Sequence, residues 1–197
     1  MKTLALAFLL AVQTPLAPPA SNPALASQPN LVANCGVWRG RSTSINAEGA
    51  ASPAVNVTKT IAIIDNVWYQ VNEYENPDGS KRRSRFVGRP EPGGGVAILS
   101  MDRPEAPKHP SVFRPLTTTD GVLRSYDQAT GREVSIESFS TRGNFRIMTG
   151  HSYKWNDEKT EPTGVNAVSV VTETRTGLPP AQPLFEFTAA DRRRLGF

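Results

Sequence analysis

The sequence predicts an all-β protein, folded as an antiparallel up-and-down barrel or a sandwich with a short helix near its C-terminal end. The prediction depends on short runs with β-type alternation, on turn signals between them, and on a near absence of helical periodicity. We expect about 8–10 strands, and a closed barrel would leave no exposed strand edge. The predicted strands cover residues 37–45, 55–64, 68–75, 82–87, 96–101, 122–126, 133–140, 144–155 and 166–174.

The N-terminal stretch has the pattern of an export signal. Lys2 supplies the positive charge, and residues 4–12 form an apolar run too short for a membrane span, which needs roughly 20 residues. A small-x-small site places cleavage after Ala26, with Ala20 as the second choice. We therefore expect a signal peptide over 1–26, a protein that is periplasmic or secreted, and no transmembrane segment in the mature chain.

Residues 27–35 form a polar lead-in that ends at Cys35, the only cysteine. A single cysteine excludes an internal disulfide, so the hydrophobic core must stabilise the fold. We interpret Cys35 as a small buried residue. A lipid anchor at Cys35 is the alternative, although Asn34 is a poor match to the residue that precedes a lipidated cysteine.

Strong turn signals separate the strands. Residues 76–79, Asn-Pro-Asp-Gly, predict a tight hairpin, and glycines 131 and 143 lie in two further turns. Residues 103–119 contain four prolines, which cannot donate to a β-ladder, and this segment is predicted to be a long loop. The predicted barrel domain covers 36–177.

The tail at 178–197 begins with a proline-rich linker. Thr188, followed by an acid three residues later, predicts the start of a helix that continues over 192–195. The apolar side chains before this helix are expected to dock on the barrel. They are Leu184, Phe185 and Phe187.

No catalytic motif is evident in the sequence. It has two histidines without metal-binding spacing, no phosphate-binding loop and no nucleophile elbow. The net charge of +4 includes basic clusters at 81–85 and 192–194, but aromatic residues are not interleaved with them as in single-strand nucleic-acid binders. We therefore expect a binding protein rather than an enzyme, with no nucleic-acid partner, no catalytic residue and no bound metal ion.

The strand at 145–155 is the main source of candidate binding residues. Alternate residues of a strand point to opposite sides, and we expect the apolar alternate set to face the interior. Trp68 is a further interior candidate, and Lys59 is expected either at the barrel mouth, the favoured position, or inside a cavity. The predicted ligand-binding residues are Phe145, Ile147, His151, Tyr153, Trp155 and Trp68.

The residues Gly36-Val37-Trp38 resemble the Gly-x-Trp motif that opens the first strand of the lipocalin and calycin superfamily. The resemblance implies a calycin-like barrel with Trp38 closing one end. It also implies that a basic residue of the last strand, here Arg175, covers the indole ring through a cation–π contact. Gly36, Trp38 and Arg175 are therefore the expected structural closure of the barrel.

The resemblance implies a small apolar or amphipathic ligand inside the barrel. The longer run 36–40, Gly-Val-Trp-Arg-Gly, also resembles the opening of nitrobindin-type haem barrels, which implies haem as an alternative ligand with His151 as its axial ligand. The third alternative is a structural or interaction protein whose barrel is filled by its own side chains.

Overall fold

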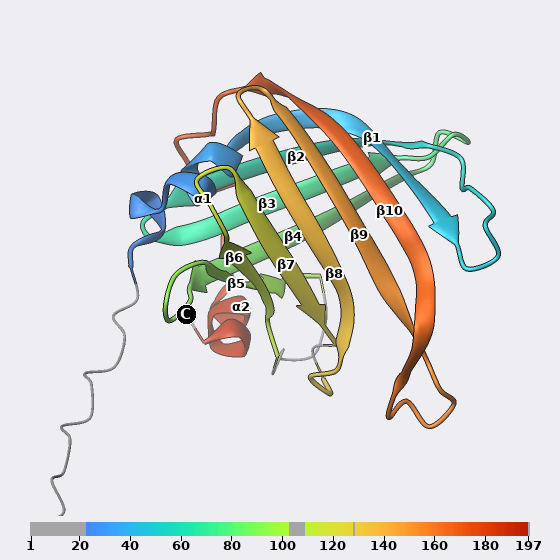
Figure 1. Ribbon diagram of the computed structural model, residues 1–197. Helices are drawn as coiled ribbons and strands as arrows, with labels where there is room; N and C mark the ends of the chain where they lie inside the picture. Colours follow the sequence, from blue (N-terminus) through green and yellow to red (C-terminus); the bar gives the residue numbers. More distant parts are fainter. Residues whose placement is uncertain (1–22, 103–108, 128, 197) are drawn as a thin grey trace, which may run out of the picture.

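The computed structural model describes residues 23–102, 109–127 and 129–196, which form a closed antiparallel barrel with short helices outside it (Figure 1). The strands are β1 (Gly36–Asn46), β2 (Val55–Ile64), β3 (Val67–Glu75), β4 (Lys81–Pro90), β5 (Val96–Ser100), β6 (Ser111–Pro115), β7 (Asp120–Tyr126), β8 (Glu133–Arg142), β9 (Phe145–Trp155) and β10 (Pro162–Gly177). The helical segments are η1 (Leu25–Ser27), α1 (Pro29–Asn34) and α2 (Ala189–Leu195).

Each strand pairs with its neighbour in the chain, and β1 closes the barrel by pairing with β10. This arrangement confirms the all-β prediction and selects the up-and-down barrel over the sandwich. At the closure, Trp38 lies opposite Arg175 on β10 and opposite Lys59 on β2. The three side chains therefore belong to one band around the inside of the barrel.

The proline-rich segment is not the continuous loop that was expected. Strand β6 lies within it and pairs with β5 on one side and β7 on the other. Pro110 precedes this strand and Pro115 ends it, so neither proline has to donate from the middle of a ladder. Residues 103–108 lie outside the described residues.

The helices η1 and α1 cover one end of the barrel, which we call the closed end. Leu25 and Leu31 are completely buried there and pack in one core with Trp38. Asn30 donates to the carbonyl oxygens of Thr117 and Asp120, which fixes α1 to the segment between β6 and β7.

Cys35 follows α1 and is buried in the same core as Leu31. Burial raises the pKa of its thiol to about 12, against an opposing effect of Arg175. The side chain is therefore a neutral thiol at physiological pH, which supports the interpretation of Cys35 as a core residue.

The C-terminal tail packs on the outside of the barrel. Phe185 and Phe187 contact Tyr69 of β3, with ring centroids 5.4 and 5.8 Å away. Helix α2 follows, and Thr188 and Asp191 cap its first turn reciprocally, as the sequence predicts. The tail thus covers the outer side of β3 and leaves the interior of the barrel to the strands and α1.

Candidate functional site

Trp38 closes the barrel from the inside and is fully buried. Its indole nitrogen donates to the carbonyl oxygen of Asn34 at 2.9 Å, and the Arg175 guanidinium lies 4.6 Å from the ring centroid. The two side chains are therefore in contact where β1 meets β10. The guanidinium of Arg146, which was not predicted, lies over the same ring at 4.3 Å.

Gly36 allows β1 to begin beside the end of β10. Its φ of +135° lies in the region that only glycine adopts without strain, and an added Cβ would lie 2.9 Å from the carbonyl oxygen of Gly177. The glycine of the Gly-x-Trp motif therefore has a backbone role, while Trp38 supplies the packing.

Beside Trp38, the interior contains an ion-pair cluster around Glu173, whose side chain is inaccessible to solvent. Arg146 binds one carboxylate oxygen through Nε at 2.7 Å and Nη2 at 2.6 Å. Lys59 lies 3.3 Å from the other oxygen and also contacts the sulfur of Met148 at 3.3 Å. The favoured placement of Lys59 at the barrel mouth is therefore wrong, because its charge is compensated inside.

Burial lowers the pKa of both cations in this cluster, since removal from water disfavours the charged form, and the charge of Glu173 opposes that effect. The cluster could have been anticipated from strand alternation. Glu173 is two residues from Arg175, so an inward Arg175 requires an inward Glu173. A buried carboxylate in turn requires a cation from a neighbouring strand.

Next to the cluster, the barrel encloses a cavity of about 230 Å³. One part of its wall is apolar and aromatic, and another part carries amides, hydroxyls and charged groups. Trp68, the interior candidate on β3, lies in this wall, whereas its neighbour Tyr69 faces the C-terminal tail. The apolar lining consists of Ile61, Trp68, Phe86, Ile98, Phe113, Leu123, Phe139 and Met148, and the polar lining of Asn34, Lys59, Gln70, Asn72, Tyr74, Ser111, Ser125, Glu137 and Arg146.

The polar side of the cavity includes an ordered row of side chains on β3. The indole nitrogen of Trp68 donates to Gln70 at 3.2 Å, and Gln70 donates to Asn72 at 3.0 Å. Asn72 then donates to the hydroxyl of Tyr74 at 3.1 Å. Because each side chain in the row hydrogen-bonds to the next one, the row holds the cavity wall in place without a ligand.

Glu137 on β8 differs from the other charged groups of the interior. Its side chain lines the cavity, and no hydrogen-bond or ion-pair partner for it is found among the described residues. Burial raises the pKa of its carboxyl group, while the positive charge of Lys59 opposes the increase. The cavity therefore contains one carboxyl group whose acceptor capacity is unused.

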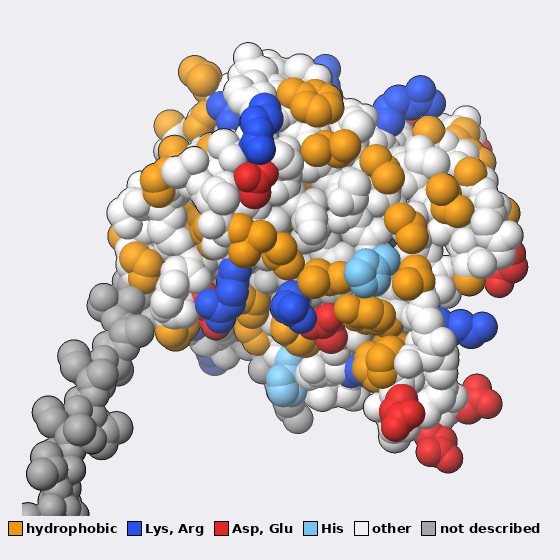
Figure 2. Space-filling model, in the orientation of Figure 1, with side chains coloured by type: hydrophobic (Ala, Val, Ile, Leu, Met, Phe, Trp, Pro, Cys, Tyr) orange, Lys and Arg blue, Asp and Glu red, His pale blue; other side chains and the backbone are white. Residues whose placement is uncertain are grey.

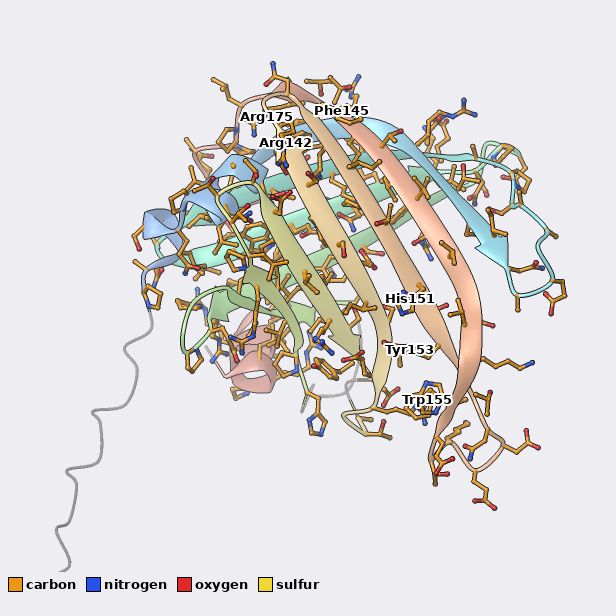
Figure 3. The ribbon with its side chains drawn as sticks, in the orientation of Figure 1. Arg142, Phe145, His151, Tyr153, Trp155 and Arg175 are labelled. Atoms are coloured by element: carbon orange, nitrogen blue, oxygen red, sulfur yellow. The ribbon has the colours of Figure 1, made fainter. Side chains whose placement is uncertain are left out.

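The predicted inward face of β9 is wrong. Arg146 and Met148 line the cavity, whereas Phe145 is exposed. His151, Tyr153 and Trp155 lie on the outer side with Phe145 (Figure 3), and Ile147 belongs to the same alternate set of β9. Interiors are normally apolar, which favours the apolar set for the inner face. Here the interior needs Arg146 to pair with Glu173, which forces the alternate residues outward.

The outward residues of β9 contact one another instead of a ligand cavity. The ring of Tyr153 lies 5.1 Å from that of His151 and 6.5 Å from that of Trp155, and Arg132 lies over Trp155. His151 lies opposite Val168 on β10 and Ile136 on β8. Figure 2 shows histidine and hydrophobic side chains together on this outer surface.

This placement does not fit haem inside the barrel with His151 as its axial ligand. His151 is on the outer face, and the other histidine, His109, is exposed beside Gly131. The cavity is also smaller than the roughly 300–1,000 Å³ typical of pockets for drug-sized ligands, so a macrocycle the size of haem exceeds it.

The residues that the structure describes contain no group of three or more His, Cys, Asp or Glu side chains arranged to hold a metal ion. Within the same ranges, every helix is too short or too polar to cross a bilayer.

A scan against protein-family models and a search of curated proteins each found no match to the sequence. Several solved structures share this fold, including two of different length. A protein of unknown function from the DUF3598 family of Nostoc punctiforme matches with a TM-score of 0.51 and 16% identity, over 84% of this chain and 53% of that one. Rv2717c from M. tuberculosis matches with a TM-score of 0.53 and 14% identity, over 78% and 98%.

This chain thus spans about half the length of the Nostoc protein. Identities this low establish similarity of fold alone. With the closed ten-strand topology, the two structures are consistent with a calycin-like barrel.

Proposed function

We propose that this protein binds a small amphipathic molecule inside its barrel. The observation that carries the proposal is the cavity beside the Glu173 cluster, which has an aromatic wall on one part and unused polar capacity at Glu137 on another. A barrel filled by its own side chains would leave no such volume. The cavity therefore favours ligand binding over the purely structural alternative.

The size of the cavity limits the ligand. An apolar engineered cavity of about 150 Å³ accepts benzene, and the barrel interior encloses about 230 Å³. A molecule with one or two fused aromatic rings matches this volume. The aromatic side chains Trp68, Phe86 and Phe113 supply surfaces for stacked or edge-on contacts with such a ring system.

Substitution of Leu123 by tryptophan tests this function. Leu123 lies in the apolar wall, so the larger side chain in Leu123→Trp would occupy the ligand volume. Naphthalene, titrated calorimetrically into the wild-type protein, should bind, and its affinity should fall at least about tenfold in the variant, a loss of about 1.4 kcal/mol.

Val170→Trp is the matched control, because Val170 is 39% exposed on the outer side of β10. This variant should bind naphthalene as the wild type does. Wild-type protein that binds no naphthalene, or equal loss in both variants, would contradict binding inside the barrel.

We propose, in addition, that the protein is exported and processed before residue 23. Leu25 is fully buried at the closed end, and its backbone N–H donates to Asn66 at 2.8 Å. Cleavage after Ala26 would remove these contacts, so they support Ala20, the second-choice site. N-terminal sequencing of exported protein should begin at Ser21; a start at Ser27, or an unprocessed chain, would contradict this proposal.

A further inference from the structure

We infer that the ligand is a neutral aromatic molecule with a hydroxyl group, which donates a hydrogen bond to Glu137 and accepts one from Lys59. This inference rests on the proposed function, because it names the class of molecule that the same cavity would bind. Three features support it: the position of Glu137, the charge balance of the interior, and the hydrogen-bonding capacity that remains on Lys59.

The barrel holds Glu137 in place through the strand beside it. Glu137 lies opposite Gly150 on β9, and a Cβ at Gly150 would lie only 2.5 Å from Cγ of Glu137. The glutamate therefore crosses its neighbouring strand at a position where that strand has no side chain. The missing side chain at Gly150 leaves the room that the Glu137 side chain occupies where it lines the cavity.

The unused capacity of Glu137 stands out because nearby polar groups have partners. Glu173 binds Arg146 and Lys59, and the side chains from Trp68 to Tyr74 form a continuous row. A carboxyl group accepts hydrogen bonds in both its ionised and its protonated state. A ligand with a hydrogen-bond donor would supply the hydrogen bond that Glu137 does not receive from the described protein groups.

The charges of the interior favour a neutral ligand. Lys59 and Arg146 supply two positive charges, and Glu173 and Glu137 can supply two negative ones. Arg175 lies apart from the cavity, where it donates to the carbonyl oxygen of Ala33 and covers Trp38. A charged ligand would add an uncompensated charge to this set, which is costly away from water.

Lys59 adds a donor to the same site. An ammonium group has three donors, and the contacts of Lys59 are the Glu173 carboxylate and the Met148 sulfur. A ligand hydroxyl can use both neighbours, since it donates to a carboxyl oxygen and accepts from an ammonium group. An amine or a carboxylate would repel one of these two charged groups.

A matched series of naphthalenes tests the inference. Calorimetric titration at pH 7 would compare 2-naphthol, the nearly isosteric 2-methylnaphthalene, 2-naphthoate and 2-naphthylmethylammonium. We expect 2-naphthol to bind about tenfold more tightly than each of the others, because a hydrogen bond to a charged group is worth more than a neutral contact. Stronger binding of the carboxylate or the ammonium compound would overturn the inference.

Two variants of Glu137 then test whether this residue accepts the hydrogen bond from the ligand hydroxyl. In Glu137→Leu, 2-naphthol should lose about tenfold in affinity, while 2-methylnaphthalene should bind as tightly as before or more tightly. Glu137→Gln keeps the shape and one acceptor oxygen, so its effect on 2-naphthol should be intermediate. Ser138→Leu, on the outer side of the same strand, is the control and should leave the series unchanged.

The outcomes separate the inference from the function on which it rests. If no naphthalene binds, the proposed function fails and the inference with it. If 2-methylnaphthalene binds as well as 2-naphthol, or if Glu137→Leu affects both equally, the cavity binds ligands but Glu137 does not select a hydroxyl group. Thermal unfolding should show whether Glu137→Leu is folded. If Glu137→Leu is unstable, the affinities of Glu137→Gln still decide between the outcomes.

Discussion

Two glutamates lie inside the barrel, and their surroundings differ. Glu173 at the closed end crosses Gly40, and Glu137 in the cavity wall crosses Gly150. The steric arrangement is therefore the same: a glycine on the neighbouring strand makes room for an inward carboxylate. Glu173, however, binds two cations, whereas Glu137 lines open volume without a partner among the described residues.

The difference separates a structural region from a candidate binding region. Around Glu173, Arg146 and Arg175 enclose Trp38 and hold three strands together through ion pairs and ring contacts. Around Glu137, the wall is ordered by its own hydrogen bonds and still has acceptor capacity available. A satisfied network stabilises a fold, while an unsatisfied group beside a cavity costs stability unless a ligand satisfies it.

Removal of the negative charge of Glu173 should have the largest effect on stability. Glu173→Gln leaves two buried cations without their carboxylate and should lower the free energy of unfolding by about 3–5 kcal/mol. Urea unfolding at pH 7 measures the change. Glu75→Gln is the control, because its ion pair with Lys81 is exposed and should contribute less than about 1 kcal/mol. Equal losses of stability in Glu173→Gln and Glu75→Gln would mean that the buried cluster does not stabilise the barrel.

The glycines that make room for the carboxylates should show the next largest effect. A Cβ at Gly40 would lie 1.8 Å from the carbonyl oxygen of Thr172, and that backbone cannot move without disturbing the β1–β10 closure. Gly40→Ala should lower the free energy of unfolding by about 1–3 kcal/mol. Gly164→Ala, where no atom lies within 4 Å, should be nearly neutral. A neutral Gly40→Ala in thermal or urea unfolding would show that the closure adjusts easily.

The smallest expected effect is the pH dependence of stability that Glu137 causes. Because burial raises the pKa of Glu137 above its ordinary value of 4.5, the folded protein binds more protons than the unfolded chain above that pH. The contribution of Glu137 to stability therefore falls as pH rises through its folded pKa. Glu137→Gln removes this dependence and should stabilise the protein by about 1 kcal/mol at neutral pH.

Urea unfolding of the wild type and Glu137→Gln from pH 4 to pH 8 would measure this difference. The other charged groups of the interior, Lys59 and Glu173, are present in both proteins, so the difference isolates Glu137. A difference that stays constant with pH, or that favours the wild type at neutral pH, would show that the charge of Lys59 already stabilises the Glu137 carboxylate.

Strand β9 shows how far sequence reasoning reached. Alternation correctly divided its residues into two faces, but the choice of the inner face depended on the assumption that the interior is the more apolar side. Arg146 lies inside because Glu173 and Trp38 are there, and both belong to other strands. For β6 the rule about proline was correct, but it restricts ladder positions and does not exclude a short strand between two prolines.

The sequence by itself determined the all-β class, the positions of the strands other than β6, and the C-terminal helix cap, because alternation, turn residues and caps act over a few neighbouring positions. The contact between Trp38 and Arg175 was implied by the Gly-x-Trp resemblance, not by local patterning. Only the tertiary structure decided which face of each strand lies inside the barrel. It therefore also decided which of the two glutamates forms ion pairs with buried cations. Glu173 and Glu137 have similar local environments in the sequence. Their difference arises where β1, β2, β8, β9 and β10 come together, and pairing between distant strands brings their charges into one interior.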